Sequence, residues 1–393
     1  MQFRRIGQLV AATTVSAVAL SGAQAVAQEN KTTISVTNIT DIHGHLEDKI
    51  GDPAKAGDEI GVARLQTLIK QVNEGQEFNL TSSGDNVGGS AFVSAISDDK
   101  YTLEALNEMG MKVTAVGNHE FDKGTEDLTG RIADSSDYPI LGANVFKDGK
   151  PLLEASHVEE IDGVKVGYVG TVTENTKYKV SAAKIPGITF TNPAEATNKE
   201  ATRLKESGEA DVVVALMHED AQGFAEDFNK DVDVAFGGDT HVATKGEIER
   251  EGALPLQWAQ GHEYGKLLND VDITFDKTAK KITDISLKQY DATAAAKVEP
   301  DAEIAAIVKK AQQEAEIEGA KTAGTVKRAL FRGSDENADS GSNRGVESTL
   351  NNFIADGQRY AMSKQVGKDI EIGVMNAGGV RADLKGGDVT YKD

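Results

Sequence analysis

Nine side chains of types that bind metal ions or transfer protons fall in five short segments of the chain. They are Asp41, His43, Asp85, Asn118, His119, Asp122, His218, Asp239 and His241. Nearly every segment follows an apolar run rich in β-branched residues, which is typical of a buried strand. Each side chain is therefore expected where a strand ends. Carboxylate, imidazole and amide groups gathered in this way predict a site for two metal ions and the hydrolysis of a phosphate ester by metal-activated water.

The first two segments supply carboxylates. Asp41 and His43 are two residues apart at the expected end of an extended strand, so their side chains point to one side and can chelate one ion. The alternative for this pair is a solvated loop. Asp85 lies in Gly84-Asp85-Asn86, and its two carboxylate oxygens can bridge two cations about 4 Å apart. The alternative interpretation of Asp85 is an aspartate that only stabilises a turn.

Residues 117–122, Gly-Asn-His-Glu-Phe-Asp, form the most specific segment. Asn118 can provide a neutral oxygen ligand. His119 can donate to the negative charge that develops on a phosphate or to the leaving oxygen. Asp122 can orient that imidazole and keep it protonated. The alternative is a helix cap followed by a surface histidine.

The histidine distribution supports a shared site. The chain has seven histidines, and four of them (His43, His119, His218 and His241) fall in these segments. A lone histidine usually has a structural role, but four at equivalent positions are hard to explain in that way.

Helices must alternate with the strands to bring these segments together. The apolar spacing predicts helices at 61–73 and 101–109 and strands at 32–40, 78–83, 112–116, 212–216 and 232–236. This alternation indicates a layered α/β domain. Later in the chain we expect a helix at 345–362 and a strand at 371–375.

The N-terminal sequence and the composition indicate where the protein is located and which partners it can bind. Residues 1–27 resemble a secretory signal peptide, with Arg4-Arg5 before an apolar run and a small-x-small cleavage site. A formal charge of −21 argues against a nucleic acid polymer or an anionic membrane as partner. No cysteine is present, which excludes thiolate ligands and disulfides.

In its motif order the chain resembles the calcineurin-like metallophosphoesterases and, more narrowly, the exported 5′-nucleotidase family. That family includes UDP-sugar hydrolases and 2′,3′-cyclic-nucleotide phosphodiesterases. The resemblance covers nearly all of residues 33–393 and includes Asn376-Ala377-Gly378-Gly379-Val380-Arg381. It implies a layered β-sandwich flanked by helices and two divalent ions, which can be Mn, Zn, Mg, Co or Ca.

The resemblance also implies a role for each residue. Asp41, His43 and His241 would hold one metal, Asn118 and His218 the other, and Asp85 would bridge them. His119 and Asp122 would form the catalytic dyad. Arg344, Asn376 and Arg381 match substrate-binding positions. The alternative for Arg344 is a surface arginine at a helix start, because that end of a helix favours anions.

Two departures from the family pattern stand out. Asp239 occupies a position that is usually histidine and would be a ligand of the second metal. Its extra charge would leave the centre at about +1 instead of about +2, by formal counting for dications. We therefore expect a weaker pull on phosphate and a preference for harder ions such as Mn²⁺, Mg²⁺ or Ca²⁺. In addition, family members continue beyond Asp393, so base recognition is assigned to no residue.

The sequence thus predicts four segments: a signal peptide (1–27), a dimetal phosphoesterase domain (30–291), a helical linker (292–323) and a partial substrate-binding domain (324–393). The expected activity is that of an exported enzyme, secreted, periplasmic or in the cell envelope, that hydrolyses nucleoside 5′-monophosphates. Cyclic nucleotides or UDP-sugars are alternative substrates. A non-catalytic nucleotide-binding surface protein is the alternative of another class.

Overall fold

The computed structural model describes residues 30–380 and 382–393, and it divides into two compact units between Gln312 and Gln313. The predicted signal peptide at 1–27 and the candidate residue Arg381 lie outside the described residues. In the described part of the chain, no helix combines the length and the apolar character needed to cross a bilayer.

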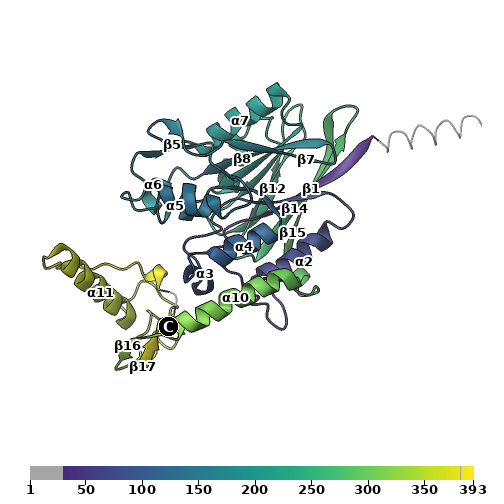
Figure 1. Cartoon of the computed structure of the whole chain (residues 1–393). Helices are drawn as coiled ribbons and strands as arrows, with labels where there is room; N and C mark the ends of the chain where they lie inside the picture. Colours follow the sequence, from purple (N-terminus) through teal and green to yellow (C-terminus); the bar gives the residue numbers. More distant parts are fainter. Residues whose placement is uncertain (1–29, 381) are drawn as a thin grey trace, which may run out of the picture. The chain divides into compact units, whose positions relative to one another are not determined.

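One six-stranded sheet of the first unit carries the first three motifs. Its strand order is β15 (Lys281–Asp291), β14 (Leu267–Asp276), β1 (Lys31–Ile39), β2 (Phe78–Ser82), β3 (Met111–Ala115) and β4 (Ile140–Leu141). Strands β1 to β4 are parallel, so the carboxyl ends of β1, β2 and β3 lie at the same edge. The predicted helices α2 (Val62–Val72) and α4 (Lys100–Glu108) pack beside this sheet (Figure 1).

A second six-stranded sheet carries the other two motifs. Its order is β12 (Ala243–Ile248), β13 (Leu256–Gly261), β11 (Val234–Gly237), β10 (Val212–His218), β8 (Val164–Val172) and β7 (Ser156–Ile161). The four central strands are parallel. Helix α7 (Pro193–Ser207) covers the outer face of β8 and β10 (Figure 1). It begins where the side chain of Asn192 accepts a hydrogen bond from the Glu195 N–H over 2.9 Å, a standard N-cap.

The inner faces of the two sheets pack against each other and form the main core. Val36 and Ile273 of the first sheet and Tyr168, Val214 and Phe236 of the second are fully buried in one cluster. A hydrogen bond also joins the layers, because the Asn79 amide donates to the Tyr168 hydroxyl over 3.0 Å. These contacts confirm the predicted sandwich with helices outside it.

Short elements complete the first unit. They are α3 (Phe92–Ala95), α5 (Thr125–Asp127), α6 (Thr176–Lys179), α8 (Ala221–Phe224), α9 (Ala292–Ala295) and a small sheet of β6 (Lys150–Pro151), β5 (Val145–Lys147) and β9 (Ile188–Phe190). Helix α10 (Ala302–Gly319) contains the division between the units.

The second unit is small. It holds β16 (Thr322–Val326) paired with β17 (Gly387–Thr390), and α11 (Thr349–Val366). Helix α11 begins at Thr349 and not at Gly345, because the Ser348 side chain caps it through the Asn351 N–H over 3.1 Å. The strand predicted at 371–375 was wrong. Among the described residues no strand pairs with it, and Ile372 and Val374 are 77% and 80% exposed.

Candidate metal centre

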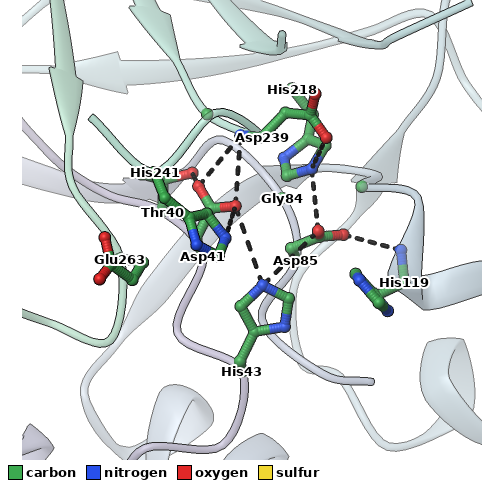
Figure 2. Close-up of polar contacts among 12 residues, drawn as sticks. Thr40, Asp41, His43, Gly84, Asp85, His119, His218, Asp239, His241 and Glu263 are labelled. Atoms are coloured by element: carbon green, nitrogen blue, oxygen red, sulfur yellow. Dashed lines mark hydrogen bonds and ion pairs between the residues drawn. The ribbon is translucent and has the colours of Figure 1, made fainter. Parts of the chain in front are cut away.

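The predicted ligand residues converge where the two sheets present the carboxyl ends of their strands. Asp41 follows β1, Asp85 follows β2 and Asn118 follows β3. His218 is the last residue of β10, and Asp239 follows β11. Figure 2 shows the side chains of both sheets turned toward one another around Asp85. Their convergence is the outcome expected from parallel strands in two packed sheets.

Potential ligand atoms lie close together in three overlapping groups. The groups are Asp41, His43 and His241; His43, Asp85 and His119; and Asp41, Asp85 and His218. Oδ2 of Asp85 lies 3.7 Å from Nε2 of His43 and 3.0 Å from Nε2 of His218, so this carboxylate sits between the two histidines. Nε2 of His241 is 3.4 Å from Oδ1 of Asp41. Asp239 is also near, with Oδ1 3.7 Å from Nε2 of His218.

The two buried histidines are oriented as metal ligands are. Nδ1 of His43 faces the Gly88 carbonyl over 2.7 Å, and Nδ1 of His218 faces the Ser83 carbonyl over 2.8 Å. A carbonyl only accepts, so each Nδ1 carries a proton and each ring directs its Nε2 toward the carboxylates. Nε2 of His218 is buried against Oδ2 of Asp85, 3.0 Å away. A ring nitrogen buried against carboxylates needs a positive charge beside it, which a proton or a metal ion can supply, so these residues fit a metal ion.

The charges at the site agree with this. Burial lowers the pKa of His218, but the charges of Asp85 and Asp41 outweigh it and raise that pKa to about 10. Burial opposes ionisation of Asp85 as well, yet His218 and His43 hold its pKa well below the ordinary value. Burial lowers the pKa of His43 despite the nearby Asp85, which favours its neutral form. A bound dication would take the place of the proton that His218 otherwise binds.

Five of the candidate ligand residues have left-handed backbone. The φ angles are +51° at Asp41, +46° at His43, +51° at Asp85, +70° at Asp239 and +57° at His241. The expectation that Asp41 and His43 are paired by an extended strand end was therefore wrong, although the two side chains do converge. Left-handed backbone is uncommon outside glycine and persists where the surrounding structure holds it.

Backbone hydrogen bonds hold these loops. The Asp41 N–H donates to the Gly84 carbonyl over 3.0 Å, and the His43 N–H donates to the Asp85 carbonyl over 3.1 Å. The Asp239 N–H donates to the Asp41 carboxylate over 3.2 Å, which links the second sheet to the first. Gly84, at φ +100°, cannot carry a side chain, since a Cβ there would lie 2.8 Å from the Gly117 nitrogen.

His119 and Asp122 form a hydrogen-bonded pair beside the centre. Nδ1 of His119 donates to Oδ2 of Asp122 over 2.8 Å, and the two side chains are 37% and 36% exposed. The His119 N–H donates to Oδ1 of Asp85 over 2.8 Å, which fixes the dyad relative to that carboxylate. Burial lowers the pKa of His119, but the bond to Asp122 and the charge of Asp85 prevail and raise it to about 9.

Sequence reasoning missed the role of Glu120. This carboxylate is buried and accepts four backbone N–H groups, from Asp85, Asn86, Val87 and Gly117, over 2.6 to 3.3 Å. It thus joins the loop after β2 to the loop after β3. Burial raises its pKa and the charge of Asp85 raises it further, to about 7. Its place inside the 117–122 motif was the available signal.

We expect Glu120→Ala to destabilise the metal-free protein by at least about 3 kcal/mol, because buried N–H groups would lose their acceptor at about 1–3 kcal/mol each. The midpoint of urea unfolding measures this. Glu126→Ala, at an exposed position on α5, is the matched control and should stay within about 0.5 kcal/mol of wild type. Equal midpoints for the two variants would contradict the joining role.

A second residue missed from the sequence is Lys179, at the end of α6. Its ammonium forms an ion pair with Oδ1 of Asp239, the residue that departs from the family pattern. One polar atom of the Asn118 amide lies 2.8 Å from the same Oδ1. If this atom is the amide nitrogen, it donates a hydrogen bond to Asp239. If it is the amide oxygen, it would share a cation with Asp239.

The substrate-binding candidates belong to the second unit. Arg344 lines a cavity of about 160 Å³ together with Arg332, Asn343, Ala377 and Val380. Asn376 is exposed and precedes the short turn Ala377–Gly379. Arg332, which the sequence did not single out, also borders the cavity. Its guanidinium is held by Asp383 over 3.1 Å and by the Ser340 carbonyl over 2.8 Å.

Comparison with protein families agrees with the geometry. Residues 34–243 match the family described as calcineurin-like phosphoesterase, and residues 322–393 match the 5′-nucleotidase C-terminal domain. The chain belongs to the calcineurin-like phosphoesterase family. Calcineurin-like phosphoesterases are metal-dependent hydrolases with a dinuclear divalent metal centre, in agreement with the predicted cofactors and with the clustered Asp and His side chains.

The chain of this calcineurin-like phosphoesterase spans only part of the length of the curated relatives that it matches. Endonuclease YhcR of Bacillus subtilis is 30% identical over 92% of the chain, which spans 30% of that protein. Cell wall protein Lmo0130 of Listeria monocytogenes is 29% identical over 96% of the chain, which spans 54% of that protein. The structure of a 5′-nucleotidase precursor from Thermus thermophilus has the same fold, with a TM-score of 0.67, 21% identity and coverage of 91% of this chain and 72% of that one.

Proposed function

We propose that the chain hydrolyses phosphate monoesters of nucleosides with two divalent ions held at the centre described above. The observation that carries the proposal is the orientation of His43 and His218. Both direct Nδ1 to a backbone carbonyl and Nε2 toward carboxylates, which leaves Nε2 and the carboxylate oxygens placed to share a cation.

The ligands divide into two sets around Asp85. Asp41, His43 and His241 have close ligand atoms and would hold one ion. His218, Asn118 and Asp239 would hold the other, and Asp85 would bridge them because its carboxylate lies between His43 and His218. When bound, the ions would neutralise charge on the phosphate and lower the pKa of a water molecule.

The chain's own acid is His119. Its Nδ1 is engaged by Asp122, so Nε2 is the nitrogen left for substrate. With a pKa raised to about 9, chiefly by Asp122 acting against burial, the ring is protonated near neutral pH. It can therefore donate to a phosphoryl oxygen or to the leaving alcohol. Asp122 keeps the ring oriented during that donation.

The proposal that the substrate carries a nucleoside depends on residues of the second unit. Its match to the 5′-nucleotidase C-terminal domain and the cavity beside Arg344 support a nucleoside 5′-monophosphate as substrate. The planar guanidinium of Arg344 suits a phosphate or a sugar. Asn376 and Arg381 are proposed to act with it.

A phosphodiester is the second candidate substrate, because one relative is named an endonuclease. A Mn²⁺-supplemented assay on AMP, UDP-glucose, 2′,3′-cyclic AMP, bis-p-nitrophenyl phosphate and single-stranded DNA separates the two. Turnover of AMP far above the others supports the proposal, whereas turnover of DNA or of the model diester alone supports the second candidate. Activity on none of them, in protein shown to contain two metal ions, would leave a non-catalytic binding protein.

We also propose that the protein is exported. The pattern of residues 1–27 supports this, and one relative is named a cell wall protein. Sequencing the N-terminus of the mature chain from its native host tests the proposal. A mature protein that retains residues 1–27 would contradict it.

A further inference from the structure

The carboxylate of Asp239 brings a third negative charge to the centre, beside those of Asp41 and Asp85. The sequence alone therefore predicts a formal charge of about +1 with two dications bound, by the counting used for such ions. The structure adds a cation that this count omits. The ammonium of Lys179 contacts Oδ1 of Asp239, and the Asp239 side chain is only 8% exposed.

The position of Lys179 is fixed by the fold. Helix α6 follows β8, the parallel neighbour of β10, and the Thr173 N–H donates to the His218 carbonyl over 2.9 Å. Thr176 at the start of α6 and Val180 just after it are both buried. The helix is thus anchored at both ends, and the loop that precedes it is bonded to the end of β10 that carries His218. Among the lysines and arginines of the described residues, Lys179 alone has an ion pair with a carboxylate of the proposed centre.

We propose that Lys179 is a charge-compensating residue of the centre, so that the Asp239–Lys179 pair takes the place of one neutral ligand. The formal charge with two dications then returns to about +2. The centre keeps its attraction for an anionic phosphate while Asp239 still offers an oxygen to the second ion. This inference rests on the proposed metal centre, and it replaces the expectation of a weaker pull on phosphate.

Removal of the Lys179 charge should change the affinity for the second metal ion and the affinity for phosphate in opposite directions. Lys179→Met leaves Asp239 uncompensated, so the second Mn²⁺ should bind more tightly while orthophosphate binds about ten-fold more weakly to the metal-loaded protein. Damage to the fold would weaken both. Lys179→Arg should restore both affinities to within about three-fold, because it keeps the charge.

The experiment is calorimetric titration of the full chain with Mn²⁺ and then with orthophosphate. Lys177→Met is the matched control, since Lys177 is exposed on the same helix and lies over the Tyr178 ring at 5.1 Å. The double variant Lys179→Met/Asp239→His has the same formal charge as wild type and should regain wild-type phosphate affinity.

The outcomes separate the inference from the proposed function. Failure of the wild-type chain to take up Mn²⁺ would overturn the metal centre and the inference with it. If wild type binds two Mn²⁺ and phosphate but Lys179→Met behaves as Lys177→Met does, only the inference falls. A double variant as weak for phosphate as Lys179→Met would likewise show that charge is not what Lys179 supplies. Binding as expected without hydrolysis of any nucleotide would sustain the inference and remove the proposed activity.

Discussion

Replacing His119 by alanine is expected to lower kcat on whichever phosphate ester the wild-type protein hydrolyses best by about 10² to 10⁴-fold, the usual contribution of a positioned acid or base. The imidazole is the group of the dyad that can donate at Nε2, and the bond from this residue to Asp85 comes from its backbone N–H, which alanine keeps. KM and the content of bound metal should therefore change little. Steady-state kinetics and metal analysis of the same preparation measure these quantities.

His157→Ala is the matched control for His119→Ala. His157 also pairs with a carboxylate, Glu159, over 2.7 Å, but it lies on β7 outside the centre. Its kinetics should match wild type. A His119→Ala enzyme with wild-type kcat would exclude His119 as the acid, and one that had lost its metal would show a role in binding instead.

Removing the Asp85 carboxylate is expected to lower both the metal content and the activity, unlike the substitution of His119. Asp85 lies between the two ligand sets, so Asp85→Ala should reduce bound metal below two ions and activity by at least about 10³-fold, equivalent to about 4 kcal/mol. Wild type should gain about 2.7 kcal/mol from Mn²⁺ at a hundred times its Kd, which raises Tm by about 5 °C. The variant should lose that gain.

Differential scanning calorimetry with and without Mn²⁺, and with a chelator, measures this. Asp284→Ala, an exposed aspartate on β15, should keep the full shift. A shift retained in Asp85→Ala would mean that the ions bind elsewhere.

The arrangement of the centre was largely predictable because strand ends are visible in the sequence. Runs rich in apolar or β-branched residues precede Asn118, His218 and Asp239, and parallel strands bring such ends to one edge. The local reason given for pairing Asp41 with His43 was wrong, since a left-handed φ leaves no mark in residue spacing. The Asp41 and His43 side chains do lie close together, but left-handed backbone and not an extended strand end brings them there.

Other features depend on contacts that no local pattern encodes. Lys179 and Asp239 are far apart in sequence, and their pairing requires β8 to lie beside β10 and α6 to return to that edge. The predicted strand at 371–375 had suitable residues but no partner strand among those described, and a strand is stable only when another pairs with it. The spacing of apolar residues indicates which face of a helix or strand is buried, but it does not indicate which other element packs against that face.

The left-handed backbone at the candidate ligand residues lowers the thermal stability of the protein at the positions that its metal binding needs. Such a conformation costs a non-glycine residue of the order of 1 kcal/mol or more, and it occurs at five of the candidate ligands. Glycine at His43 or His241 would relieve that cost and remove a buried or half-buried ionisable group at the same time. Selection of variants for heat resistance alone would therefore tend to discard the candidate metal ligands first, and a screen for more stable variants must measure Mn²⁺ uptake alongside melting temperature.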